Sequence, residues 1–117
     1  LHTDRKDIIL AVLEAIAFAC RQALELTGRA DPGKLKLDGG LTGCSTLMKI
    51  QATVLKSSLT ISDDSEVTAV GASIAAHRGT TGKLIKVEQP VRTVASWPDF
   101  QDTYEEKYQR WLERTKI

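Results

Sequence analysis

Cysteine is scarce in this sequence of 117 residues, and long apolar runs are missing. The two cysteines, Cys20 and Cys44, form no paired motif of the kind that binds metal ions or performs redox chemistry. They favour a reduced, intracellular setting, where disulfide bonds are rare. No segment approaches the roughly 18 apolar residues of a membrane span, and the first residues, LHTDRKD, lack the apolar core of a signal peptide. We therefore expect a soluble, cytoplasmic protein.

An excess of charge of either sign is also missing. Sixteen basic residues stand against fifteen acidic ones, which gives a formal net charge of +1. Such a balance favours neither nucleic acid nor an anionic membrane as a partner. Hydrophobic residues make up 42% of the sequence, enough to form the core of one globular domain.

Apolar residues spaced three and four positions apart predict a long helix at the start of the chain. It runs from about Asp4 to Thr27, and Gly28 is its stop signal. We expect Glu14 and Arg21 to lie on its solvated face. The residues expected on its buried face are Ile8, Val12, Leu13, Ile16, Ala19, Cys20, Ala23 and Leu24.

The middle of the chain shows the order strand, helix, strand, helix. The predicted segments are a strand at Leu35–Asp38, a helix at Gly43–Lys56 with Thr42 as N-cap, a strand at Ser58–Ser62, and a helix that starts at a capping box of Asp63 and Glu66. Short links between them favour a parallel βαβ unit with a right-handed crossover, and hence an α/β fold. Small residues in the third helix predict a closely packed neighbour, and residues 77–83 are expected to form a loop.

The end of the chain predicts one more helix. It follows Trp97 and Pro98 and is rich in charged residues. Its aromatic and apolar stripe, typical of a packing surface, consists of Phe100, Tyr104, Trp111 and Leu112. We expect this segment to dock on the rest of the domain.

The turn from Asp38 to Ser45 carries a pair of glycines, Gly39 and Gly40. Glycine can take positive φ and leaves space beside the backbone, and the following helix start offers free N–H groups to an anion. At the carboxyl end of a parallel strand, such a turn suits nucleotide binding. The spacing matches neither the dinucleotide motif nor the phosphate-loop motif, so a plain tight turn explains these residues equally well.

Other candidate sites have weaker support. The histidines, His2 and His77, have no partner pattern, so no metal site is predicted. Cys44 is not accompanied by a recognisable base, which argues against a nucleophilic role.

Four segments, taken in order, resemble the FGGY family of carbohydrate kinases, most closely its glycerol kinase members. LDGGLTGCSTLMKIQATVL at Leu37–Leu55 is similar to the family's adenosine-binding segment, and EVTAVGASIAA at Glu66–Ala76 is similar to the helix that follows it. AVLEAIAFACRQALE at Ala11–Glu25 resembles an upstream family helix. YQRWLER, residues 108–114, resembles the family's C-terminal ending.

The resemblance implies a partial actin-like or ribonuclease-H-like ATPase domain. Family members hold ATP between two domains and transfer its γ-phosphate, with Mg²⁺, to a hydroxyl group of a sugar or polyol. At the matching positions, Gly40 and Cys44 would lie at the adenosine, and Gly39 and Leu41 would shape the same turn. Residues 1–95 would belong to the C-terminal nucleotide-binding domain and residues 96–117 would form its docking helix. The full enzyme would be a homo-oligomer.

The resemblance also limits what this chain could do. The family's phosphate loop, polyol-binding residues and catalytic aspartate lie upstream of the matched part. We therefore expect no catalytic or metal-binding residue here, and a fragment that cannot transfer phosphate by itself; the missing part would hold the metal and the acceptor. The sequence departs from the family at Cys44, Thr53 and Lys56, where Asn, Asp and Gly are usual. Two alternatives stay open: a pentulose kinase of the same family, or a non-catalytic actin-like interaction module.

Overall fold

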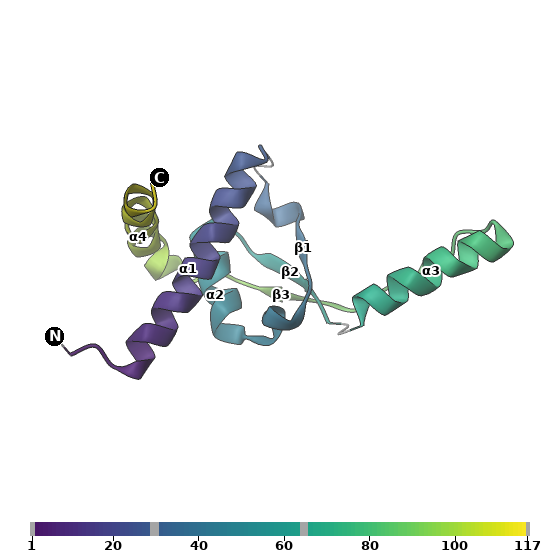
Figure 1. Ribbon diagram of the computed structural model, residues 1–117, viewed down its shortest axis with the longest axis horizontal. Helices are drawn as coiled ribbons and strands as arrows, with labels where there is room; N and C mark the ends of the chain where they lie inside the picture. The colour runs from purple at the N-terminus through teal and green to yellow at the C-terminus, as the bar shows by residue number, and fades with distance from the viewer. Residues whose placement is uncertain (1, 29–30, 64–65, 117) are drawn as a thin grey trace.

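The computed structural model of the chain describes residues 2–28, 31–63 and 66–116. These residues form four α-helices and three β-strands in a mixed arrangement (Figure 1). Their order is α1 (Arg5–Leu26), β1 (Lys36–Leu37), α2 (Ser45–Leu55), β2 (Leu59–Ser62), α3 (Val67–Thr81), β3 (Val91–Val94) and α4 (Gln101–Arg114). Short 3₁₀ turns occupy Pro32–Lys34, Gly40–Gly43 and Pro98–Phe100.

The three strands form one sheet in the order β1-β2-β3. β1 pairs with β2 in parallel, with Leu37 opposite Ile61, so the predicted βαβ connection through α2 is present. β3 runs antiparallel to β2 and places Val94 opposite Leu59 and Arg92 opposite Ile61. The sequence analysis did not predict β3, because an edge strand of four residues has no periodic signal of its own.

Helix α2 is the centre of the core. One of its sides packs on the sheet, where Leu47, Met48 and Ala52 meet Leu59 and Ile61 of β2. The opposite side carries Ile50 and Val54, which belong to a second cluster with residues of α1 and α4. Burial on both sides explains why seven of the eleven residues of α2 are buried.

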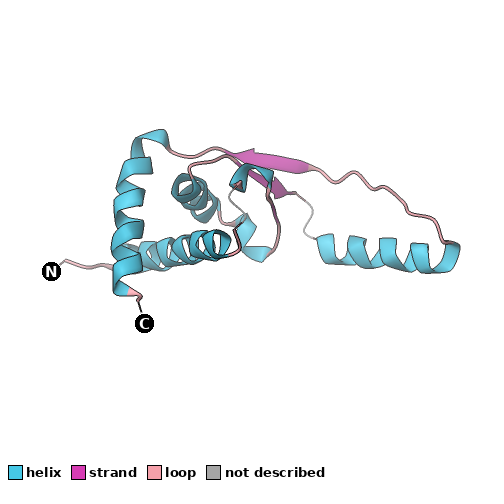
Figure 2. Cartoon of the chain, turned by 90° about the horizontal axis from the view of Figure 1, so that it is seen from above, coloured by secondary structure: helices cyan, strands magenta, loops and turns pink. Residues whose placement is uncertain are grey.

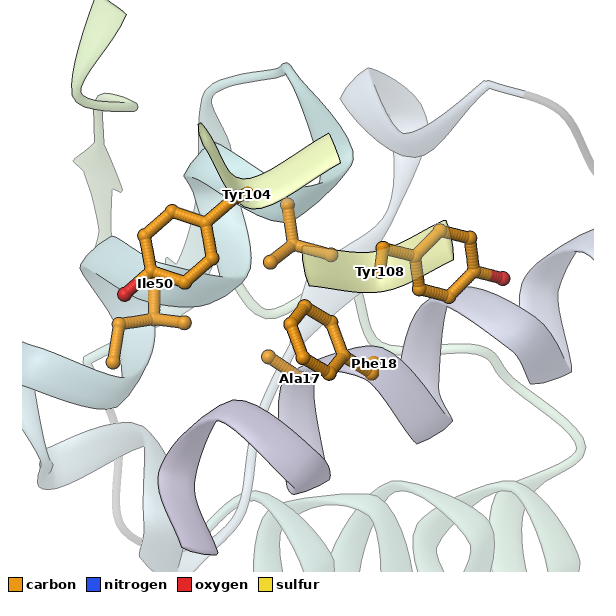
Figure 3. Packing of buried hydrophobic residues seen from close by; sticks show 6 residues of the cluster. Ala17, Phe18, Ile50, Tyr104 and Tyr108 are labelled. Atoms are coloured by element: carbon orange, nitrogen blue, oxygen red, sulfur yellow. The ribbon is translucent and has the colours of Figure 1, made fainter. Parts of the chain in front are cut away.

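The second cluster is built around an aromatic side chain of α1. Phe18 lies with its ring centroid 5.8 Å from that of Tyr108 and 5.9 Å from that of Trp111. Figure 3 shows Phe18 and Ala17 below Ile50, Tyr104 and Tyr108. The predicted docking helix therefore packs against α1 and α2, although Phe100 is 52% exposed and lies outside the buried cluster.

The buried face of α1 differs from the predicted one. Ala17 and Phe18 are its buried residues, whereas Ile8 and Val12 are more than half exposed. Glu14 and Arg21, expected in solvent, have side chains only 13% and 17% exposed. The helical period showed an apolar stripe, but the position of α4 decides which side of that stripe is covered.

Polar groups of α1 are partly buried because α4 supplies partners for them. Lys107 Nζ lies 2.9 Å from Glu14 Oε1, and Tyr108 donates a hydrogen bond of 2.7 Å to Glu25. Burial, together with this carboxylate, raises the pKa of Tyr108 to about 12, so its phenol remains a donor at neutral pH.

Helix α3 differs from the prediction at both of its ends. It begins at Val67 after Glu66 as N-cap, so the predicted capping box starting at Asp63 is wrong. It continues to Thr81, where a loop was expected, and ends at Gly82 with φ of +70°. The hydroxyl of Thr81 donates to a carbonyl in the preceding turn and supports the longer helix.

The packed neighbour predicted for α3 is also absent from the part of the chain that the structure describes. No residue of α3 is buried, and the helix extends away from the other elements along the 62 Å axis of the molecule (Figures 1 and 2). Small residues such as alanine permit close packing but are also good helix formers, so their presence does not decide between these roles.

Candidate functional site

The carboxyl ends of the two parallel strands meet at one edge of the sheet, where the structure has a cleft of about 370 Å³. The chain leaves β1 through the glycine turn and leaves β2 toward α3, and both exits line the cleft. Its lining consists of Asp38, Gly39, Gly40, Thr42, Gly43, Ser62, Asp63, Val67, Thr68 and Arg92. Diverging loops at this edge are the usual place for ligands in open α/β sheets.

Gly39 has a backbone conformation that other residues avoid. Its φ of +105° and ψ of 167° lie in a region essentially restricted to glycine. The carbonyl of Gly39 then accepts hydrogen bonds from the backbone N–H of Thr42 at 3.1 Å and from its hydroxyl at 2.6 Å. Thr42 thus closes the turn, and the predicted role of Thr42 as N-cap of α2 is wrong, because Cys44 occupies that position.

The backbone of Gly40 does not have the conformation that restricts position 39 to glycine. Its φ lies outside the positive range, and a Cβ built on it meets no heavy atom within 4 Å. The space beside Gly40 is therefore open toward the cleft that it lines. A ligand could approach the backbone there without contact with a side chain of residue 40.

Only two of the four residues of the predicted adenosine site line the cleft. Gly39 and Gly40 line the cleft. Leu41 is 60% exposed and lies outside the lining, and Cys44 packs beside the core cluster between α2 and the sheet. The side chain of Cys44 makes no capping hydrogen bond to α2. The structure thus brings the two glycines to the cleft and directs Cys44 toward apolar neighbours.

Sequence reasoning missed Arg92 as a cleft residue. Its Nε lies 3.2 Å from Asp63 Oδ1, and its Nη2 donates a hydrogen bond to the carbonyl oxygen of Thr42. The available signal was an arginine flanked by Val91 and Thr93 in an extended segment, which is also common on solvated strands. Only the pairing with β2 shows that this arginine points to the covered side.

A second hollow of similar volume, about 380 Å³, lies at the carboxyl ends of α1 and α2. Its charged side chains Arg21 and Lys56 are engaged with carboxylates of α1 and α4. The polar groups of this hollow therefore serve helix packing, and the cleft at the sheet edge is the better candidate site.

The part of the chain that the structure describes contains neither a cluster of metal ligands nor a helix that could span a membrane. No three His, Cys, Asp or Glu side chains among these described residues are grouped in a way that could hold a metal ion. None of the described helices combines the length and apolar character needed to cross a membrane.

Comparison with known proteins shows which family the chain belongs to. Residues 1–80 match the FGGY family of carbohydrate kinases, C-terminal domain. The chain belongs to this family. The match includes the glycine turn and most of α3, so the resemblance of these segments to the family is confirmed.

Curated relatives of the FGGY chain include several glycerol kinases. One from Saccharopolyspora erythraea is 43% identical over 77 residues, which cover 62% of this chain and 15% of the relative. One from Haloferax volcanii is 32% identical over 119 residues, covering 95% of this chain and 23% of the relative. The chain thus spans less than a quarter of the length of these relatives.

A solved structure agrees with the family assignment. A xyloylose kinase from Brucella ovis superposes with a TM-score of 0.79 at 25% identity, covering 97% of this chain and 25% of that one. The predicted α/β fold, part of an actin-like ATPase domain, is therefore confirmed.

Proposed function

We propose that this chain is the ATP-binding C-terminal portion of a glycerol-like carbohydrate kinase, with the adenosine of ATP at the glycine turn. The observation that carries the proposal is the position of Gly39 and Gly40 at the cleft where β1 and β2 end. A family match over residues 1–80 supplies the chemical class. Leu41 and Cys44 belong to the proposal as residues of the same turn.

The geometry suits holding a nucleotide better than making or breaking bonds. The open space beside Gly40 admits a flat base or a ribose against the backbone. Asp38, Asp63 and Arg92 place charges of both signs around this space. A base that removes a proton from an acceptor hydroxyl would come from outside this chain, as would most ligands of Mg²⁺, which would enter with the phosphates.

In the complete enzyme, the acceptor hydroxyl oxygen would bond to the γ-phosphorus while the bond from that phosphorus to the bridging oxygen of ADP breaks. The hydroxyl proton would pass to the external base. We therefore expect the 117-residue chain to bind ATP without transferring phosphate. We also propose a cytoplasmic location and a homo-oligomeric complete enzyme.

Glycerol is the proposed acceptor because curated relatives at 32% and 43% identity are glycerol kinases. A pentulose is the second candidate, supported by the structural likeness to the xyloylose kinase. An acceptor assay on the enzyme that contains this chain would separate them: phosphorylation of a pentulose and not of glycerol would overturn the first choice.

The nucleotide site can be tested by titrating the ¹⁵N-labelled chain with MgATP while recording amide shifts. We expect shifts concentrated in residues 38–44, and Gly40→Val should weaken binding at least about tenfold, or about 1.4 kcal/mol. Gly79→Val is the matched control, because its added side chain also meets open space but lies in α3, outside the cleft lining. Shifts confined to other elements, or equal affinity of the Gly40→Val variant, would contradict the proposal.

A further inference from the structure

Arg92 occupies an unusual position for a charged residue. In β3 it shares a face with Val94, and the two lie opposite Ile61 and Leu59 of β2. Directly paired residues of antiparallel strands point to the same side of a sheet, and Leu59 and Ile61 are fully buried under α2. Arg92 therefore projects toward the side of the sheet that α2 covers, at the border between the core and the cleft.

The guanidinium group of Arg92 joins the two chain segments that form the cleft walls. On one side it donates to the backbone carbonyl of Thr42 in the glycine turn. On the other, its Nε lies 3.2 Å from Asp63 Oδ1 just after β2. Asp63 is itself fixed to the start of β3, because its backbone N–H donates to the carbonyl of Pro90 at 2.9 Å.

Through Thr42, the contact from Arg92 also acts on Gly39, the residue with positive φ in the turn. Thr42 donates both its N–H and its hydroxyl to the carbonyl of Gly39. A group that fixes the carbonyl of Thr42 therefore also restrains Gly39 and the peptide groups beside Gly40. The hydrogen bond from Arg92 comes from strand β3, so it fixes the turn relative to the sheet.

We propose that Arg92 is a positioning residue that holds the glycine turn in its nucleotide-binding conformation. It acts through Thr42, with Asp63 orienting its guanidinium. This inference rests on the proposed function, because it takes the turn as the ATP contact. A turn that is already ordered loses less conformational entropy when ligand binds, so losing the contact from Arg92 to Thr42 weakens ATP binding by loosening the turn.

Lysine cannot replace this arrangement completely. The planar guanidinium offers donors in a fixed fork, so Nε and Nη2 can serve two acceptors in different directions at once. A lysine ammonium keeps the charge but lacks this geometry. The order of the turn and the affinity for ATP in Arg92→Lys should therefore lie between those of the wild type and of Arg92→Met.

The experiment compares the wild type, Arg92→Lys, Arg92→Met and the control Arg78→Met in the full 117-residue chain. Arg78 lies in the last turn of α3 and outside the cleft lining, so it controls for loss of one arginine. ¹⁵N relaxation of residues 39–43 without ligand reports the order of the turn, and calorimetry with MgATP reports affinity. Circular dichroism confirms that each variant is folded at the measuring temperature.

We expect Arg92→Met to increase turn mobility and to weaken ATP binding about five- to thirty-fold, with Arg92→Lys intermediate and Arg78→Met unchanged. Unchanged relaxation in residues 39–43, or a mobile turn with unchanged ATP affinity, would overturn the role of Arg92. If the wild type does not bind ATP, the proposed function fails, while a turn loosened by Arg92→Met still supports its positioning role. Should Arg92→Met not fold, Arg92→Lys and Arg92→Gln carry the same comparison.

Discussion

Arg21 of α1 donates two hydrogen bonds to the carboxylate of Glu105 in α4, from Nη1 to Oε2 at 2.5 Å and from Nη2 to Oε1 at 3.2 Å. The same guanidinium donates to the carbonyl of Val54 in α2 and lies 4.1 Å from the centroid of the Tyr108 ring. One side chain thus joins three helices around the edge of the aromatic cluster.

The Arg21–Glu105 pair should make stability depend on pH in the acid range. Hydrogen bonding from Arg21 lowers the pKa of Glu105 from 4.5 to about 2 in the folded chain. A folded-state pKa below the unfolded one means that the contribution is complete above about pH 4.5 and lost as the pH falls toward 2. Urea unfolding at a series of pH values should show this loss. Glu105→Gln should reduce the dependence of the free energy of unfolding on pH between about pH 2 and pH 4.5.

A double-mutant cycle isolates the pair from other carboxylates. Arg21→Met, Glu105→Gln and the double variant should give a coupling free energy of about 1 kcal/mol at pH 7, falling toward zero near pH 2. A coupling that does not change with pH would show that the pair is not the source of the acid sensitivity.

Thr53 should contribute to stability through its hydroxyl. Its Oγ1 donates to the carbonyl of Lys49 at 2.7 Å and accepts the backbone N–H of Trp97 at 3.0 Å. Thr53→Val keeps the shape but leaves that N–H without its acceptor, so we expect a loss of about 1–3 kcal/mol in the free energy of unfolding. Thr53→Ser should keep most of the stability that Thr53→Val loses. A Thr53→Val variant with the same free energy of unfolding as the wild type would refute this account.

Lys56 ends α2 in a left-handed conformation, with φ of 53° and ψ of 37°. This conformation costs a non-glycine residue about 1–2 kcal/mol, which explains why glycine suits the position. We expect Lys56→Gly to stabilise the chain by about 0.5–1 kcal/mol, after allowance for the greater freedom of unfolded glycine and for the lost ion pair with Glu105.

Lys56→Ala separates the two effects at this position. It removes the ammonium but keeps a Cβ, so it should be no more stable than the wild type in thermal or urea unfolding. Equal stabilities for the alanine and glycine variants would mean that backbone strain at residue 56 is negligible.

The two glycines of the turn should respond differently to alanine. Gly39→Ala places a Cβ on a backbone at φ +105°, and we expect a loss of about 1–3 kcal/mol. Gly40→Ala enters open space and should change stability by less than about 0.5 kcal/mol. Urea denaturation of both variants gives the comparison, and a Gly40→Ala variant as unstable as Gly39→Ala would contradict the observed turn.

Helix α3 should be the least protected helix against hydrogen exchange in this chain. It has no buried residue, and helices of about this length are marginal in water without packing. We expect its amides to exchange well before those of α2 in a mass-spectrometric time course. Comparable protection of the two helices would require a contact for α3 that the described residues do not show.

Much of the local structure could be predicted from the sequence. The spacing of apolar residues located α1, α2 and α4, and the double glycine located the turn after β1. Helix ends were less certain, because the predicted caps at Thr42 and Asp63 depend on side chains that found other partners. The two glycines could be placed in the candidate site, but Arg92 could not, because the sequence does not show what it faces.

Local sequence was enough to locate the glycine turn and the main part of α1, α2 and α4, since these features depend on residues three or four positions apart and on the steric freedom of Gly39. Tertiary structure decided which polar groups are partners. Arg21 meets Glu105 across 84 positions and Arg92 meets Thr42 across 50, so both contacts depend on the packing of whole elements. Such pairings depend on strand register and helix docking, which no local pattern specifies.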